Sequence, residues 1–570
     1  MARKEIAVDS VAEAYLTLLA ERGVEYLFAN AGTDFAPLVE AFAKAARTGT
    51  PVPRPILATH ENLALSMAHG WAIVTARVPA VMVHVSVGTA NGVCGVFNAA
   101  RDNVPMLFTA GRSPLTETGL PGARDVYIHW AQEMFDQAGM VRELVKWDYE
   151  LRNGEQLETV VDRALAVATT QPKGPVYLSL PREVLAEPLP GFAYDAPSRR
   201  VAAAPAGPDA NAIDEAAHIL TAAKNPLIIT ASAGREPAAV AALADLAERF
   251  ALPVVQHRPR HLSLPANHPC HLGYDAGPYL EDADAILVLE CDVPWVPSLK
   301  TPGRQCRVVH LGVDPLFQRY PIRGFPCDLA ITGAPATALP ALAAALERHA
   351  EQDTIAARRQ RIGTVREAQH AGWRKTRQTV AGLRPIHMAW ASACIADAKS
   401  DDAIVVNEYT LMPEHCGSNL PGTYFGSSPA SGLGWGGGAA LGAKLAAPDR
   451  LVIATLGDGS HLFGNPVAVH HAAAAHDLPV LFVIMNNSMW GAVRRATQGM
   501  YPQGEAMRSN KPPLIDLDEL PAFEQVCAAA GGYGERVEDP AALPAALGRA
   551  LHAVTVERRQ ALLNVICRGP

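Results

Sequence analysis

The 570-residue sequence contains no apolar run that approaches the roughly 18 residues of a membrane-spanning helix. Its apolar runs, such as PVLFVIM at 479–485 and AILVLE at 285–290, have the length of buried strands. The opening residues, MARKEIAVDS, contain neither an apolar core nor a cleavage site, so we expect no signal peptide there. These absences argue against a membrane protein and against a secreted one.

Cysteine pairing patterns are also missing. The nine cysteines are odd in number and scattered, and no two of them form a CxxC pair; they are Cys94, Cys270, Cys291, Cys306, Cys327, Cys394, Cys416, Cys527 and Cys567. Neither a disulfide framework nor a zinc site is therefore indicated. A reducing compartment, the cytoplasm, fits this cysteine usage best.

Charged residues are few for a chain of this size. They make up 19% of the sequence, against 49% apolar residues, which is typical of a globular rather than a disordered protein. The formal net charge is -8, so an anionic partner would be repelled. We therefore expect neither nucleic acid nor a membrane surface as a partner.

Short apolar runs rich in β-formers alternate with Ala- and Leu-rich amphipathic segments along the whole chain. This alternation predicts an α/β fold with parallel sheets. The expected strands include residues 80–87, 105–111, 226–231, 285–290, 450–457 and 479–487. A Pro- and Ala-rich stretch at 186–211 indicates a linker, and a charged helical stretch at 346–382 marks a second boundary. The sequence therefore predicts three doubly wound parallel-sheet domains, over residues 1–187, 188–365 and 366–570.

Polar residues end two of the strands expected in the third domain. Asp458 lies between two glycines after LVIATLG, and Asn487 ends LFVIMNN after an Ala-rich crossover. Because the carboxyl ends of parallel strands share one sheet edge, both residues should lie there, where ligands collect. One carboxylate and one amide oxygen suit Mg²⁺, which also takes oxygens from water or phosphate. Gly459 and the helix that opens at Ser460 favour an anion, so this edge predicts a magnesium-diphosphate site.

Each half of this pattern has a simpler interpretation, namely a tight Gly-Asp-Gly turn and an asparagine helix cap. Other nucleotide-binding motifs do not offer a better account. A P-loop sequence is absent, and GLGWGG at 432–437, which matches GxGxxG, has no strand expected before it. The two halves together, at the ends of adjacent strands, favour a ligand site.

With these residues the sequence resembles the thiamine-diphosphate (ThDP) enzymes, whose signature is GDG followed, one crossover later, by NN; here these are residues 457–459 and 486–487. The resemblance covers essentially the whole chain and is strongest to benzoylformate decarboxylases and acetolactate synthases. It implies a pyrimidine-binding, a middle and a diphosphate-binding domain, in that order. It also implies ThDP and Mg²⁺ as cofactors, a 2-oxo acid or aldehyde as substrate, and at least a homodimer, with a homotetramer expected.

The resemblance assigns roles to residues of the third domain. Asp458 and Asn487 match the metal ligands, together with the backbone carbonyl of Met489. Leu433, in SGLGWGG, matches the apolar wedge that bends the cofactor, and the carbonyl of Ser431 would face the 4′-amino group. As an ordinary core leucine, Leu433 would need no such explanation. The positions that match diphosphate contacts are Thr410, Gly459, Ser460, Trp490 and Gly491.

Glu61 stands at the entrance of the helix predicted within PRPILATHENLALSMAHGWA. A carboxylate in a first helical turn can simply complement the helix dipole. The resemblance instead matches Glu61 to the glutamate that hydrogen-bonds the pyrimidine N1′ of the cofactor and favours its imino form. In that family the cofactor is bound mainly by the neighbouring subunit, which is why at least a dimer is implied.

Three further residues bear on the type of reaction. His84, in VMVHVSVGTAN, and His268, in LPANHPCHLG, match the histidine pair with which benzoylformate decarboxylases exchange protons. Thr33, in FANAGTDF, stands where those enzymes have a serine over the cofactor. Without the resemblance, His84 would be interpreted as a core residue and His268 as a loop residue. Because acetolactate synthases do not usually have a histidine at the position of His84, decarboxylation is favoured.

Three functions stay open. The first is decarboxylation of a 2-oxo acid with carboligase side activity, and the second is an acetolactate synthase-like transferase that condenses two carbonyl compounds. The third is a catalytically silent ThDP-binding regulatory protein, against which Glu61 argues, because a silent protein has no need of the activating carboxyl. The middle-domain stretch TASAGREPAAV has too few glycines for the flavin pattern of acetolactate synthases, so FAD is not expected. Ala496 replaces a bulky aromatic residue near the substrate pocket, so an aryl substrate is not assumed.

Overall fold

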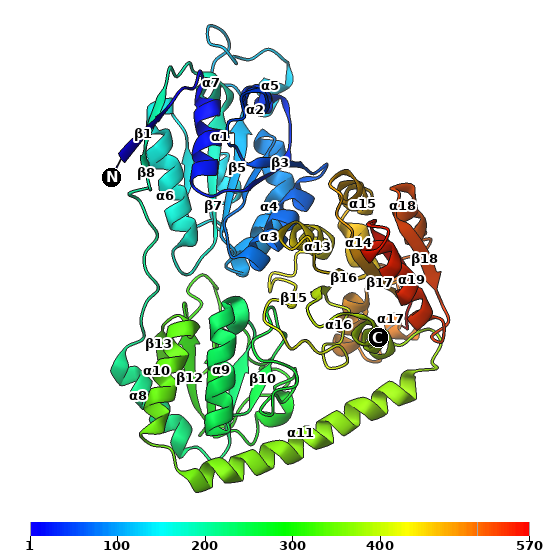
Figure 1. The fold of residues 1–570 in the computed structure, drawn as a ribbon. Helices are drawn as coiled ribbons and strands as arrows, with labels where there is room; N and C mark the ends of the chain where they lie inside the picture. The colour runs from blue at the N-terminus through cyan, green and yellow to red at the C-terminus, as the bar shows by residue number, and fades with distance from the viewer. Residues whose placement is uncertain (1, 510, 569–570) are drawn as a thin grey trace.

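The computed structural model describes residues 2–509 and 511–568, and it confirms an α/β protein with three domains, each built around a parallel sheet. Figure 1 shows the N-terminal domain at the top, the middle domain at the lower left and the C-terminal domain on the right. Strand order in each sheet departs from sequence order, as in doubly wound folds.

The N-terminal domain has a six-stranded parallel sheet in the order β3-β2-β4-β5-β7-β6. One face packs against α1, α2, α6 and α7, and the other packs against α3 and α4. Its elements are α1 (Val11–Glu21), β2 (Tyr26–Asn30), the 3₁₀ turn η1 (Thr33–Phe35), α2 (Ala36–Thr48), β3 (Arg54–Leu57), α3 (Glu61–Thr75), β4 (Ala80–Val83), α4 (Val85–Arg101), β5 (Met106–Arg112), α5 (Ile128–Ala131), β6 (Asp148–Glu150), α6 (Leu157–Thr169), β7 (Pro175–Pro181) and α7 (Arg182–Ala186).

The middle domain has a five-stranded parallel sheet in the order β10-β9-β11-β12-β13, with a hydrophobic core of its own. Its elements are α8 (Ala210–Ala222), β9 (Pro226–Thr230), α9 (Pro237–Phe250), β10 (Val254–Gln256), β11 (Ala285–Leu289), β12 (Arg307–Gly312), β13 (Leu329–Thr332) and α10 (Pro335–Glu347).

The C-terminal domain has a six-stranded parallel sheet in the order β15-β14-β16-β17-β19-β18. Helices α13, α15 and α18 cover one face, and α12 and α19 cover the other. Its elements are α12 (Met388–Ala398), β14 (Ile404–Glu408), β15 (Tyr424–Gly426), α13 (Trp435–Ala446), β16 (Val452–Gly457), α14 (Asp458–Phe463), α15 (Pro466–Ala475), β17 (Leu481–Asn486), α16 (Gly491–Met500), α17 (Glu505–Arg508), α18 (Phe523–Ala529), β18 (Tyr533–Val537), α19 (Leu543–Thr555) and β19 (Ala561–Ile566).

Two features of the chain lie at the predicted domain boundaries. Strand β8 (Phe192–Ala196) lies beyond residue 187, yet it pairs with β1 (Ala2–Ile6) and so returns to the N-terminal domain. The boundary placed between residues 365 and 366 falls inside α11 (Gln352–Val380), a single helix that runs from the middle to the C-terminal domain along the bottom of Figure 1. Charged residues occur all along α11, so its sequence does not indicate where its contacts pass from the middle domain to the C-terminal domain.

One expected strand limit was wrong, and one strand was not expected. The strand predicted at 80–87 ends at Val83, because Val85 has a left-handed φ of 33° and the chain turns there into α4. A strand that the sequence did not indicate, β15, precedes GLGWGG and ends at Gly426.

Among the described residues, no helix combines the length and the hydrophobicity that are needed to span a lipid bilayer.

Helices α3 and α13 join the N- and C-terminal domains into one body with a shared hydrophobic core. Their backbones approach closely because glycines lie at the crossing. A Cβ added at Gly70 would overlap the carbonyl oxygen of Ala439, and one added at Gly442 would overlap that of Met67. This contact fixes the N-terminal domain against the helix that follows residues 431–434.

The glycine at this crossing provides a stability test. Gly442→Ala should lower the free energy of unfolding by about 1–3 kcal/mol, because the new methyl group overpacks backbone atoms that cannot move aside. Gly548→Ala is the control: it also lies within a helix, and its Cβ would meet none of the described atoms within 4 Å. That control should gain about 0.5–1 kcal/mol. Urea midpoints that shift equally in both variants would contradict the account of the crossing.

Candidate active site

The carboxyl edge of the C-terminal sheet brings together the two residues predicted from GDG and NN. Asp458 follows β16 as the first residue of α14, and Asn487 follows the neighbouring strand β17. The backbone N–H of Gly459 donates to Oδ1 of Asp458 at 2.9 Å. Burial raises the pKa of Asp458, and nearby backbone amides, including those of Ser488 and Met489, partly oppose that rise. The side-chain oxygen of Asn487 accepts the N–H of Met489 at 3.2 Å.

Two oxygen atoms at this edge are left without partners. Oδ2 of Asp458 and Oγ1 of Thr410 are buried, and neither has a hydrogen-bond partner among the described residues. A buried carboxylate oxygen without a donor is costly, and a cation or a ligand donor would remove that cost. The carbonyl of Met489 accepts the N–H of Gly491 at 2.9 Å and keeps a second lone pair. The residues at this edge therefore fit a hard cation together with an anionic group.

The start of α14 is shaped by the indole ring of Trp490. A Cβ added at Gly459 would overlap that ring, so only glycine fits there. Ser460 is buried in the first turn of α14, and Gly491 begins α16. Thr410, Gly459, Ser460 and Trp490 thus gather around one helix N-terminus, as an anion site requires.

The loop that carries Ser431 and Leu433 is held from two sides. Gly432 donates its N–H to Oδ1 of Asn98 at 3.0 Å and accepts Nδ2 of the same side chain at 2.9 Å, which ties the loop to α4. Glu408 accepts the N–H groups of Gly434 at 2.9 Å and of Gly436 at 2.6 Å, which ties it to the end of β14. Ser431 has a left-handed φ of 58°, and Leu433 stays half-buried rather than joining the core.

In the N-terminal domain, Glu61 is the first residue of α3, as predicted. Asn30, at the end of β2, donates Nδ2 to Oε1 of Glu61 at 2.8 Å, and the side chain of Asn91 donates to Oε2. The carboxyl group is half-buried and held in one orientation by these two amides. A role limited to the helix dipole would not need them.

His84 lies directly after β4, where it caps the N-terminus of α4. Its Nδ1 lies 2.5 Å from Oδ1 of the buried Asp34, and Nε2 of Gln132 lies 3.3 Å from its Nε2. In the neutral ring, Nδ1–H therefore donates to Asp34 and Nε2 accepts from Gln132, a tautomer assigned from this hydrogen-bond network. Oγ1 of the exposed Thr33 lies 3.5 Å from Nε2 of His129, beside this pair.

Glycines make room for the Asp34–His84 pair. A Cβ at Gly32 would overlap the imidazole of His84, and a Cβ at Gly111 would overlap the carboxylate of Asp34. The second oxygen of Asp34 accepts the N–H of Val85 at 3.3 Å. Backbone and side chain thus cooperate to hold one imidazole at the carboxyl edge of the N-terminal sheet.

Three protein-family models match segments of the chain. Residues 9–140 match the N-terminal TPP binding domain of thiamine pyrophosphate enzymes, residues 213–342 the central domain, and residues 408–565 the C-terminal TPP binding domain. The chain belongs to the ThDP enzyme family. Glu61 and His84 lie within the first of these segments, and Asp458 and Asn487 within the last.

Two curated members of the family illustrate its range. Benzoylformate decarboxylase of Pseudomonas aeruginosa is 27% identical over 568 residues, which cover 97% of this chain and 98% of that protein. A probable acetolactate synthase of Mycobacterium bovis is 28% identical over 511 residues, which cover 86% of this chain and 85% of that protein. A ThDP-dependent 4-hydroxybenzoylformate decarboxylase from Rhodococcus jostii RHA1, whose structure is solved, is 24% identical in sequence. The two structures superpose with a TM-score of 0.76 over 98% of this chain and 99% of that chain. That structural likeness supports the fold alone.

His268 lies in a different domain from Glu61, His84 and Thr33 of this ThDP enzyme. His268 lies in the middle domain, where its Nδ1 accepts the N–H of Cys270 at 3.2 Å and its Nε2 lies 4.0 Å from Glu248 of α9. The ring is 8% exposed, and its Nε2 has no hydrogen-bond partner among the described residues. The catalytic role of His268 stays a prediction, because the family resemblance implies a site that takes residues from two chains.

Glu408 is a residue of this ThDP enzyme that sequence reasoning missed, and it provides a pH test. Burial raises its pKa to about 7, from an ordinary value of 4.5. A carboxyl whose pKa is raised in the fold contributes stability below pH 4.5 and loses it as the pH rises through 7. The stability difference between the wild type and Glu408→Gln should therefore fall by about 3 kcal/mol over this window.

Unfolding midpoints of both proteins, measured at several pH values without cofactor, test this expectation. Glutamine cannot accept both N–H groups that Glu408 binds, so Glu408→Gln should be less stable by an amount that does not depend on pH. Only the change of the stability difference with pH tests the raised pKa. A difference that stays flat with pH would contradict the raised pKa.

Proposed function

We propose that the protein decarboxylates a 2-oxo acid with ThDP and Mg²⁺, and forms carbon–carbon bonds as a side activity. The observation that carries this proposal is the Asp34–His84 pair, in which a buried carboxylate holds Nδ1 of the imidazole at 2.5 Å. Imidazole is the side chain best suited to exchange a proton at neutral pH. A decarboxylase has to protonate the carbon that has lost CO₂, and Nε2 of His84 is the atom proposed to deliver that proton.

The cofactor would be held by residues of the C-terminal domain. Asp458, Asn487 and the carbonyl of Met489 are proposed to bind Mg²⁺, and the unpartnered Oδ2 of Asp458 supports this. Leu433 would support the bend of the cofactor, and the carbonyl of Ser431 would accept its amino group. The diphosphate would be bound by Thr410, Gly459, Ser460, Trp490 and Gly491. Bound ThDP would supply a carbon nucleophile and an electron sink for the bonding electron pair that CO₂ leaves behind.

The remaining residues would control protons and position. Glu61 is proposed to hold a proton between its carboxyl group and the pyrimidine, while Asn30 and Asn91 fix that carboxyl in place. Asp34 would keep the proton on Nδ1 of His84, so that Nε2 is the atom presented to the substrate. Thr33, one residue before Asp34, would contact the substrate from the same turn.

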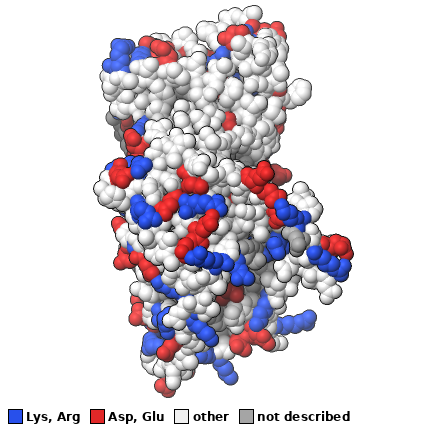
Figure 2. Space-filling model, turned by 90° about the vertical axis from the view of Figure 1, so that its right-hand side faces the viewer, with Lys and Arg blue, Asp and Glu red and all other residues white. Residues whose placement is uncertain are grey.

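We further propose a homodimer at least, with a homotetramer expected, in which Glu61 of one chain meets the cofactor held by another. Figure 2 shows a face whose upper part, at the level of the N-terminal domain, has few charged side chains. Exposed apolar side chains lie close in sequence to the proposed cofactor residues: Leu57, Val87, Phe463 and Val467. Such surfaces are typical of subunit interfaces. All nine cysteines are free thiols, which supports a cytoplasmic location.

A second candidate is a carboligase that condenses two carbonyl compounds. The observation in its favour is the 28% identity to a probable acetolactate synthase, which is level with the 27% identity to a benzoylformate decarboxylase. A panel of aliphatic and aryl 2-oxo acids, incubated with purified protein, ThDP and Mg²⁺, separates the candidates. Aldehyde and CO₂ in equal amounts would support the decarboxylase. A ligation product and CO₂ without free aldehyde would overturn it, and no CO₂ from any substrate would overturn both.

A further inference from the structure

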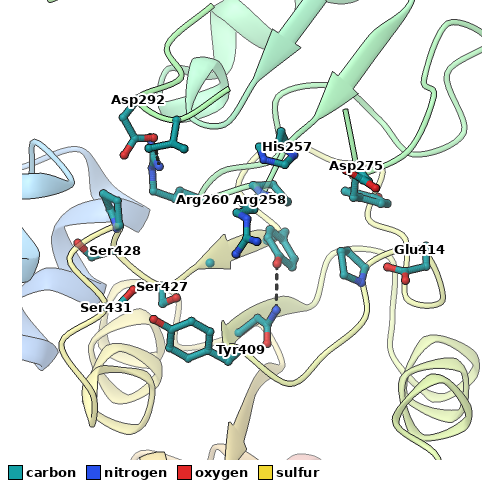
Figure 3. Close-up of a pocket in the computed structure, with 18 of the residues that line it drawn as sticks. His257, Arg258, Arg260, Asp275, Asp292, Tyr409, Glu414, Ser427, Ser428 and Ser431 are labelled. Atoms are coloured by element: carbon teal, nitrogen blue, oxygen red, sulfur yellow. Dashed lines mark hydrogen bonds and ion pairs between the residues drawn. The ribbon is translucent and has the colours of Figure 1, made fainter. Parts of the chain in front are cut away.

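A cleft of about 760 Å³ lies between the middle and C-terminal domains. It forms where the carboxyl ends of two parallel sheets meet, which is where ligands bind in such folds. His257 and Arg258 follow β10 at this place and Asp292 follows β11, while Tyr409 follows β14 and Ser427 follows β15. Figure 3 shows these side chains around the cleft.

The cleft borders the proposed cofactor site. Ser431, whose carbonyl is proposed to face the cofactor, lines it, as does Tyr409, which precedes the proposed diphosphate contact Thr410. A substrate that reacts at the cofactor can therefore extend its side chain into this space.

Arg258 is the notable charge in the lining. Its backbone has a left-handed φ of 48°, which is uncommon for a residue other than glycine. Its guanidinium makes no ion pair with any carboxylate of the described chain, whereas the neighbouring Arg260 is paired with Asp292 at 2.8 Å. In Figure 3 the guanidinium of Arg258 projects into the middle of the cleft.

His257 adds hydrogen-bonding capacity beside Arg258. It is 8% exposed, and neither ring nitrogen has a hydrogen-bond partner within residues 2–509 and 511–568. Burial, followed by the charge of Arg258, lowers its pKa, so the ring is neutral and offers one N–H donor. A buried imidazole without partners in a cleft wall indicates a ligand that completes its hydrogen bonds.

Two acids lie at the other end of the cleft. Figure 3 shows Asp275 and Glu414 on the side of Arg258 that is opposite to Ser427 and Ser431. Asp275 accepts the N–H of Gly277 at 3.0 Å, and burial raises the pKa of Glu414 towards its neutral form. Neither acid lies within ion-pair distance of Arg258, so the part of the cleft nearest the cofactor keeps its positive charge.

We infer that this cleft binds the distal end of the substrate, and that this end carries a second carboxylate held by Arg258 and His257. The inference rests on the proposed function and narrows its substrate class to 2-oxo dicarboxylic acids. A guanidinium binds a carboxylate through paired, charge-assisted hydrogen bonds, and the neutral imidazole can add one more.

The test compares substrates that differ only in the distal carboxylate. The holoenzyme is assayed with 2-oxopentanedioate and 2-oxopentanoate, and the ratio of their kcat/KM values is determined. The dicarboxylate should be preferred, and Arg258→Gln should lower the ratio by about tenfold to hundredfold. Arg304→Gln, an exposed arginine of the same domain outside the cleft, should leave the ratio unchanged.

A binding measurement separates this inference from the proposed function. Calorimetry on the holoenzyme with glutarate and pentanoate, which cannot be decarboxylated, should show tighter binding of glutarate that depends on Arg258. Failure of every 2-oxo acid to release CO₂ would reject the proposed function, while the glutarate result still reports on the cleft. Equal binding of both acids, equal ratios in Arg258→Gln and Arg304→Gln, or a flavin absorbance in the purified protein would overturn the inference.

Discussion

Replacing Glu61 with glutamine should lower turnover by about 10²–10⁴-fold, the usual range for loss of a positioned acid–base group. Asn30 and Asn91 both donate to the Glu61 carboxylate, so an amide at this position would turn its own NH₂ group towards one of them. It would also be unable to share a proton with the pyrimidine. The measurement is kcat at saturating ThDP and Mg²⁺, with the best 2-oxo acid of the panel.

Glu155→Gln is the matched control for this variant. Glu155 also lies in the first turn of a helix, and its side chain is exposed. If Glu61 only complements the helix dipole, both variants should lose at most about 1 kcal/mol of stability and no activity. Full turnover in Glu61→Gln would remove the reason to assign catalysis to this residue.

Replacing Asp34 with asparagine should slow aldehyde release by about 10²–10⁴-fold while CO₂ loss slows much less. Asp34 does not reach the substrate in this account; it is a positioning residue that acts through Nδ1 of His84. Asparagine replaces the carboxylate with a neutral amide, so the imidazole loses the negative charge that stabilises it while Nε2 carries the proton to be delivered. Single-turnover measurements that follow both products resolve the two steps.

His84→Ala should show the same product pattern, and adding Asp34→Asn to it should have little further effect. Two residues that act as a unit are expected to be strongly non-additive. Asp162→Asn serves as the control, because Asp162 is a buried aspartate of the same domain that pairs with Arg22. It should lower stability without changing the ratio of aldehyde release to CO₂ loss. Additive losses in the double variant would contradict a joint role.

The sequence could predict the residues whose position follows from strand order. Asp458 and Asn487 end adjacent parallel strands, so their meeting at one sheet edge required only the parallel arrangement. The local pattern placed Glu61 at the start of a helix, whereas its predicted role came from the family resemblance. For these residues, local pattern and topology decide the location.

Other parts of the site depend on contacts between distant segments. Asp34 meets His84 across 50 positions, and that approach is allowed by glycines at 32 and 111, which give no signal in the sequence. Asn98 and Glu408 fix the same loop from two domains, and no periodicity marks either of them. The grouping of His268 with His84 stays a prediction from the family resemblance, because the two residues lie in different domains. Tertiary packing decides these positions.

The most direct test of the central claim is a crystal structure of the protein with ThDP and Mg²⁺. The account predicts that the carboxyl group of Glu61 lies within hydrogen-bonding distance of the pyrimidine N1′ of a cofactor whose diphosphate and metal are held by Asp458 and Asn487 of a second chain. A pyrimidine remote from Glu61, or a diphosphate bound away from the start of α14, would contradict it.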